Sequence, residues 1–93
     1  MNPSNFIPKC KELVYEYARS HIDKTDEGAL ASFTEEDVYV VWYSKTLQNA
    51  KALLSTNLPD GMYYELTLNG NKNEIYFDAY KKFENKKIEL EEQ

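Results

Sequence analysis

Apolar and polar residues alternate along residues 62–83, and the rest of the predicted fold is arranged around this stretch. Its first run would present Met62, Tyr64, Leu66 and Leu68 on one face of a strand. The Asn69-Gly70 pair that follows is a strong signal for a β-hairpin turn. The returning run would place Ile75, Phe77 and Ala79 on one face. Because two strands alone are marginally stable in water, this apolar face requires a covering layer.

Two loop lengths are compatible with this hairpin. A two-residue loop at Asn69-Gly70 would set Glu65 opposite Glu74. A four-residue loop, residues 69–72, would instead pair Leu66 with Ile75, Tyr64 with Phe77 and Met62 with Ala79. Like charges directly opposite are unfavourable, and apolar cross-strand pairs contribute roughly 0.2–1 kcal/mol each. The pattern therefore favours the longer loop.

Residues 4–22 carry apolar side chains at helical spacing, which predicts an amphipathic helix. Ser4 is a candidate N-cap, with Pro8 in the first turn, where its missing N–H is harmless; a start at Pro8 itself is the alternative. The predicted stripe consists of Phe6, Cys10, Leu13, Val14, Tyr17, Ala18 and His21. This helix is the natural cover for the sheet.

Residues 23–37 are polar and acidic and are interrupted by Gly28, so they are interpreted as a long loop. Leu30 and Phe33 are expected to attach this loop to the core. A loop of this length is either functional or contains a short helical turn. The Thr34 to Asp37 segment resembles a capping box, so a helix that begins there is a competing interpretation.

Residues 38–47 are rich in β-branched and aromatic side chains and are predicted to form a strand. Regular alternation would place Val38, Val40 and Trp42 on one face, and Tyr39, Val41 and Tyr43 on the other. Gln48-Asn49 would form a turn before a second strand over residues 50–56. A helix over residues 38–54 remains the competing interpretation.

Together these elements predict an α+β fold in which an N-terminal helix packs on a four-stranded antiparallel β-meander. The meander would span residues 38–84 within a single domain of residues 1–93, although residues 78–87 could instead turn helical. The Leu58-Pro59-Asp60-Gly61 segment has the residues of a turn. The tail, residues 85–93, is expected to fray.

Composition narrows the class of protein. The formal net charge is −5, which disfavours non-specific binding to duplex DNA, although residues 38–88 carry seven lysines against five acids. The single cysteine excludes an internal disulfide and is typical of a reducing compartment. No apolar run approaches 18 residues, and no secretion signal precedes the helix. A cytoplasmic protein without a membrane partner is expected.

Three strings within residues 40–85 carry a resemblance: WYSKTLQNAKALLST, LPDGMYYE and EIYFDAYKKFEN. With them the chain resembles a family of short uncharacterised proteins encoded by phages and prophages of Gram-positive bacteria. The resemblance covers about half of the chain. It implies a phage accessory protein in a bacterial host cell, and it implies no catalytic residues.

No catalytic, metal or cofactor motif is evident. His21 lacks a recognisable nucleophile and orienting partner, and Cys10 lies on the apolar stripe, where thiols act as small hydrophobic groups. The acidic residues of the 23–37 segment lack the ligand spacing of a calcium loop. We therefore expect a protein that is not an enzyme, with no cofactor and no metal.

The residues most open to a binding role are strand aromatics with neighbouring lysines, namely Tyr39, Trp42, Tyr43, Lys45 and Lys51. The favoured hypothesis is a module that binds a host or phage protein, with a homodimer through a sheet edge or an aromatic face as one form of it. The alternative is a single-stranded nucleic-acid binder that stacks bases on these aromatics. An ordinary amphipathic strand explains the same residues without any ligand.

Overall fold

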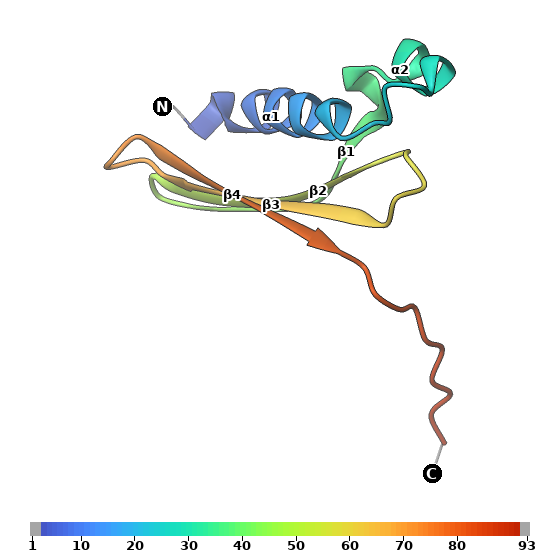
Figure 1. Cartoon of the computed structure of the whole chain (residues 1–93). Helices are drawn as coiled ribbons and strands as arrows, with labels where there is room; N and C mark the ends of the chain where they lie inside the picture. The colour runs from blue at the N-terminus through green and yellow to red at the C-terminus, as the bar shows by residue number, and fades with distance from the viewer. Residues whose placement is uncertain (1–2, 92–93) are drawn as a thin grey trace.

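The structure, a computed structural model, describes residues 3–91. Two short helical turns and two α-helices precede four strands. In chain order the elements are η1 (Pro3–Asn5), α1 (Phe6–Ser20), α2 (Glu27–Ser32), η2 (Glu35–Asp37), β1 (Val38–Thr46), β2 (Asn49–Thr56), β3 (Met62–Asn69) and β4 (Glu74–Lys81). Helix α1 lies across one face of the sheet, and the opposite face is bare (Figure 1).

The sheet is an antiparallel meander with the strand order β1-β2-β3-β4. The α+β prediction, with an N-terminal helix on a four-stranded antiparallel sheet, is confirmed. The meander ends at Lys81, three residues before the predicted limit, and residues 78–87 form no helix. Among the described residues, no helix is long and apolar enough to cross a membrane.

Helix α1 buries one side chain per turn, as its apolar stripe predicts. Phe6, Cys10, Val14 and Ala18 recur at every fourth position, and each is at most 2% exposed. They meet a row of buried side chains from β2 and β3: Ala50, Ala52, Leu54, Tyr64, Leu66 and Leu68. The helix is shorter than the predicted 4–22 range. Asn5 rather than Ser4 is its N-cap, and His21 is its C-cap.

The segment interpreted as an acidic loop, residues 23–37, contains helix α2 and the η2 turn, so the loop prediction is wrong in part. Asp26 caps α2 because its Oδ1 accepts a hydrogen bond from the Ala29 N–H at 3.0 Å. Phe33 is buried, as expected, and Leu30 is half-buried. In η2 the Asp37 carboxylate accepts from the Thr34 N–H at 2.8 Å. This turn stops after three residues because the β-branched and aromatic run of β1 follows.

The predicted faces of β1 are wrong beyond Val40, because the strand contains a β-bulge. The register with β2 shifts between Val40 and Trp42, so that Val41 is the extra residue. Trp42 pairs with Leu53, whereas Tyr43 pairs with the buried Ala52 and contacts Phe6 edge-on, with ring centroids 6.1 Å apart. The bulge therefore turns Tyr43 toward the helix and Trp42 away from it.

The β3–β4 loop has four residues, as favoured, but lies one position later than predicted. Leu66 pairs with Phe77 and Leu68 with Ile75, which leaves residues 70–73 as the loop. Asn73 takes a left-handed conformation with φ of 54°, which asparagine tolerates well. Because the shift amounts to two residues in the pairing, every side chain keeps its predicted face. The register also sets Glu65 opposite Asp78, the kind of like-charge pair that the longer loop was expected to avoid.

Candidate functional site

The bare side of the sheet, which we call the open face, carries four cross-strand rows of side chains. The register places one residue of each strand in each row. The first row is Tyr39, Ser55, Tyr63 and Tyr80; the second is Trp42, Leu53, Glu65 and Asp78; the third is Ser44, Lys51, Thr67 and Tyr76; the fourth is Thr46, Asn49, Asn69 and Glu74. Aromatic residues thus lie at both sides of this face, and charged residues lie between them.

Four aromatic side chains of the open face are extensively exposed. Tyr39 and Trp42 are 44% and 40% exposed, and Tyr76 and Tyr80 are 57% and 52% exposed. Tyr63 is half-buried in the first row, where it is paired with Tyr80 on β4. Strand-borne tyrosines and tryptophans present a large apolar surface with a polar tip, which suits contact with another macromolecule.

The centre of the open face is acidic. Lys51 Nζ lies 3.5 Å from Glu65 Oε1, so its charge is engaged within the sheet. Asp78 stands directly opposite Glu65 on the neighbouring strand. At the β4 edge, Tyr76 donates a hydrogen bond to Glu74 Oε2 at 3.1 Å, and this contact raises the pKa of the Tyr76 hydroxyl. One lysine therefore shares this face with three carboxylates.

The five sequence-predicted residues are divided between the two faces. Tyr39, Trp42 and Lys51 lie on the open face. Tyr43 lies on the helix side, and Lys45 pairs with the buried Ala50, which places it on the helix side as well. Regular alternation would also separate Trp42 from Tyr43, but the bulge exchanges their sides and places Lys45 on the helix side. No polar residue of the Val38–Tyr43 run signals this bulge.

Sequence reasoning missed four apolar or aromatic residues of the same surface. Tyr63 and Tyr80 complete the first row, Leu53 stands beside Trp42, and Tyr76 ends the third row. A signal was present, because the alternation that places Tyr64 on one face of the strand places Tyr63 on the other. Applying the same alternation along β4 would have found Tyr80.

The two residues considered for catalysis, His21 and Cys10, both pack against other residues of the chain. His21 stacks on Tyr17 with ring centroids 4.3 Å apart, and its Nδ1 lies 2.9 Å from the Tyr17 carbonyl oxygen at the C-terminus of α1. Cys10 is fully buried, and burial raises the pKa of its thiol to about 12. Such a thiol is not an accessible nucleophile. Within residues 3–91 no group of acidic, histidine or cysteine side chains is arranged to hold a metal ion.

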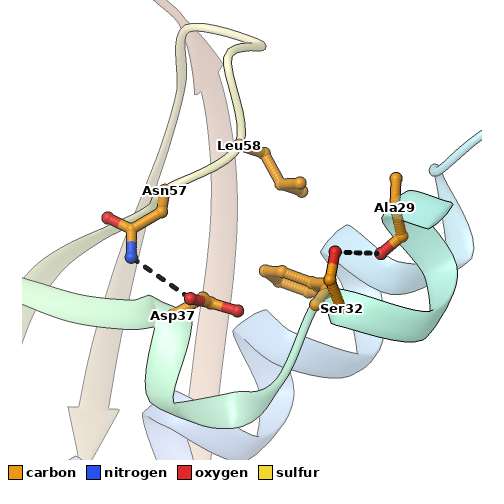
Figure 2. Close-up of a pocket in the computed structure, with 6 residues that line it drawn as sticks. Ala29, Ser32, Asp37, Asn57 and Leu58 are labelled. Carbon is orange, nitrogen blue, oxygen red and sulfur yellow. Dashed lines mark hydrogen bonds between the residues drawn. The ribbon is translucent and has the colours of Figure 1, made fainter.

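A shallow hollow of about 260 Å³ lies between α2 and the β2–β3 connection (Figure 2). Its polar side chains already have hydrogen-bond partners, since Asn57 Nδ2 donates to Asp37 Oδ1 at 3.3 Å, and Ser32 Oγ donates to the Gly28 carbonyl at 2.8 Å and to the Ala29 carbonyl at 3.5 Å. Hydrogen bonds from Thr34 and Asn57 lower the pKa of Asp37. The Asn57–Asp37 bond joins η2 to the residue that follows β2, so we interpret the hollow as a structural junction.

A second hollow, of about 470 Å³, runs along the junction of α1 and β4 and is lined by Leu13, Glu16, Tyr17, Ile75 and Phe77. We call it the α1–β4 groove. Four of its five residues are apolar or aromatic and half-buried. It was not predicted from sequence, because alternation alone does not show how far the helix extends over the last strand.

Comparison with known proteins gives one match. No curated protein and no solved structure is significantly similar to the chain. The sequence profile of a family of unknown function, DUF6275, matches residues 7–90. The match covers α1 from its second residue, the whole sheet and the tail as far as Leu90, so it extends well beyond the 40–85 region of the sequence resemblance. The chain is therefore a member of the DUF6275 family of unknown function.

Proposed function

We propose that this chain is a non-enzymatic interaction module that binds another protein through the open face of its sheet. The observation that carries the proposal is the first row, in which Tyr39, Tyr63 and Tyr80 cross the face with no layer above them. Trp42 extends this surface at the β1 side. Tyrosine and tryptophan are enriched where proteins bind one another, and they supply most hot spots.

The charges of the open face favour a partner with basic groups. Glu65 and Asp78 stand side by side in the second row, between Leu53 and the β4 edge. A partner that presents an apolar patch beside lysine or arginine would match both features. The proposed setting is the cytoplasm of a bacterial host, with the protein acting as a phage or prophage accessory factor. The sequence resemblance supports that setting, and the genomic neighbourhood of the gene tests it.

The test uses the wild-type chain and the Trp42→Ser, Tyr80→Ser double variant as baits and compares the proteins that each of them captures. Both changes lie on the open face at exposed positions, so the fold is expected to survive them. Leu47→Ser is the matched control because Leu47 is 87% exposed but lies at a hairpin tip. A protein partner should be recovered by the wild type and the control and lost with the double variant. The emission of Trp42, the only tryptophan, should shift to the blue when the recovered partner is added back.

A strictly monomeric chain that recovers no protein would count against this function. Equal recovery by the double variant and the wild type would also contradict it, because binding would then not involve the open face.

Single-stranded nucleic acid is the second candidate ligand. In its favour, Tyr39, Trp42 and Lys51 share the open face, which is an arrangement suited to base stacking. The three carboxylates on that face and the engagement of Lys51 by Glu65 oppose the approach of phosphates. Titration with single-stranded DNA and RNA at low salt tests this directly. Quenching of Trp42 that weakens as salt rises would favour it, and unchanged emission would exclude it.

A further inference from the structure

The C-terminal tail carries large apolar side chains that are mostly exposed to solvent. Phe83 is fully exposed, and Ile88 and Leu90 are 72% and 87% exposed. The tail continues from the end of β4 away from the body of the molecule (Figure 1). Its last tie to the body is the hydrogen bond from the Lys82 N–H to the Gly61 carbonyl at 2.7 Å. Exposed apolar groups of this kind mark a contact surface.

We propose that the tail of one chain is an exchanged fifth strand, which adds antiparallel to the β4 edge of a second copy and inserts Ile88 and Leu90 at the α1–β4 groove. The exchange is reciprocal and gives a symmetric dimer. It leaves the open face of each copy uncovered, so it stands separately from the proposed binding of a partner protein.

The alternation in the tail is that of a strand with one apolar side. Ile88 and Leu90 alternate with Glu89 and Glu91. A strand of this kind needs an apolar surface beside a free sheet edge, and β4 provides both. Its outer edge is unpaired, and Ile75 and Phe77 on its helix side line the α1–β4 groove together with Leu13 and Tyr17.

One antiparallel register between the tail and β4 pairs apolar residues with apolar residues and lysines with acidic residues. With Ile88 opposite Phe77, Leu90 falls opposite Ile75. The same register sets Lys87 opposite Asp78 and Glu84 opposite Lys81. Apolar and opposite-charge cross-strand pairs are both stabilising. The single mismatch is at the end, where Glu91 meets Glu74.

The same pairing within one chain would require a two-residue reversal at Lys82-Phe83. Tight hairpins of that length need residues that adopt positive φ, in most cases glycine or asparagine. Neither Lys82 nor Phe83 meets that need, and after β4 the chain continues away from the sheet without reversing (Figure 1). When the tail passes to a second copy, the same pairs form without any reversal, which is the usual logic of domain swapping.

The other edge of the sheet is a poorer acceptor. Strand β1 carries the bulge at Val41, a feature that protects edges from pairing. Tyr43 at that edge is already in contact with Phe6 on the helix. The β4 edge has no bulge in its register with β3, and it borders the groove.

Deletion of residues 83–93 is the first test. Because the described residues of the tail are exposed, the shortened chain should keep its circular dichroism spectrum and melting temperature at low concentration. Light scattering and sedimentation over about 5–200 µM should show a dimer for the full chain and a monomer for the shortened one. A full-length chain that stays monomeric throughout, or a shortened chain that still dimerises, would overturn the exchange.

Cysteine pairs test the register and the exchange together. The full chain carrying Asp78→Cys and Lys87→Cys should form a covalent dimer on mild oxidation, because these positions are opposite each other only between copies. The matched control carries Asp78→Cys and Lys86→Cys, which the register places on different faces. A disulfide within one chain, or equal crosslinking of the control, would overturn the exchange. Glu91→Lys should tighten the dimer severalfold by removing the mismatch with Glu74, and an unchanged dissociation constant would refute this register.

Discussion

The two faces of the sheet both carry large aromatic side chains but have opposite environments. On the covered face, Leu54, Tyr64 and Leu66 are at most 1% exposed. On the open face, Tyr39 in β1 and Tyr80 in β4 are 44% and 52% exposed. Strand propensity is therefore satisfied on both faces, which differ in the covering helix and in the charged side chains of the open face. High propensity alone identifies a strand without identifying which side of it is buried.

Small side chains in β2 determine which face of the sheet α1 covers. Ala50 and Ala52 lie on the covered face of β2, and both are buried. Their neighbours on the open face are the larger Lys51 and Leu53. A helix can approach a sheet closely only where side chains are short, so the pattern of sizes in β2 selects the side that α1 covers.

Truncation of a leucine on each face should give the largest difference. Leu54→Ala removes a fully buried side chain, and we expect a loss of about 3 kcal/mol in the free energy of unfolding. Leu53→Ala, one residue earlier on the open face and half-buried, is the matched control and should cost less than about 1.5 kcal/mol. Urea denaturation of the two variants measures both. Equal losses would mean that the open face is also covered in solution.

Enlargement of a small side chain on the covered face should have the next largest effect. Ala52→Val adds volume where α1 approaches β2, and overpacking of this kind costs roughly 1–3 kcal/mol. Thr67→Val changes a half-exposed position of the open face and is expected to stay within about 0.5 kcal/mol of the wild type. Thermal unfolding of both proteins makes the comparison. A tolerated valine at position 52 would show that the helix is less closely packed than its buried residues indicate.

The reactivity of thiols gives a smaller but direct measure of the difference in burial between the covered face and the open face. Burial raises the pKa of Cys10 to about 12, so the folded state holds the thiol neutral where the unfolded chain ionises near its ordinary value of 9.0. The stabilisation from this group is complete below about pH 9 and is lost as the pH rises toward 12. At pH 8 a thiol reagent should react with Cys10 only when the protein unfolds. Ser44→Cys, on the open face, should react at once in the folded protein.

A fast reaction of Cys10 in the native protein would show that α1 separates readily from the sheet. The Cys10→Ala variant serves as the blank for the reagent and should lack the corresponding loss of stability above pH 9.

Alternation predicted the faces of β3 and β4 because each of these strands has one consistently apolar side. In the β3–β4 hairpin this held even though the predicted loop was displaced, since a two-residue change in pairing preserves parity. The same rule failed in β1. Its VYVVWY run is apolar at every position, so no polar residue marks where the bulge at Val41 reverses the order.

The candidate site was predictable to the extent that it depends on parity. Tyr39 precedes the bulge and lies on the open face, as Lys51 on the regular strand β2 does. The predicted set also included Tyr43 and Lys45, which follow the bulge and lie on the helix side. Tyr63 and Tyr80 were missed because they belong to strands distant in sequence, and only the register joins them to Tyr39.

Substitutions at the two hairpin tips should have the smallest effect on stability. The tips differ in the residue that takes the left-handed conformation. Each tip holds a non-glycine residue in the left-handed region: Leu47 with φ of 53° in the β1–β2 turn, and Asn73 with φ of 54° in the β3–β4 turn. Asparagine tolerates this conformation, whereas leucine at such a position costs roughly 1–2 kcal/mol. Leu47 is 87% exposed, so its side chain contributes little burial in return. Leu47→Asn should therefore stabilise the protein by about 0.5–1 kcal/mol, measured by urea denaturation, and Asn73→Leu should destabilise it by a similar amount. If Leu47→Asn instead lowered the stability, the exposed leucine would have to be buried in solution, and the tip of the β1–β2 hairpin would join the open face as a contact surface.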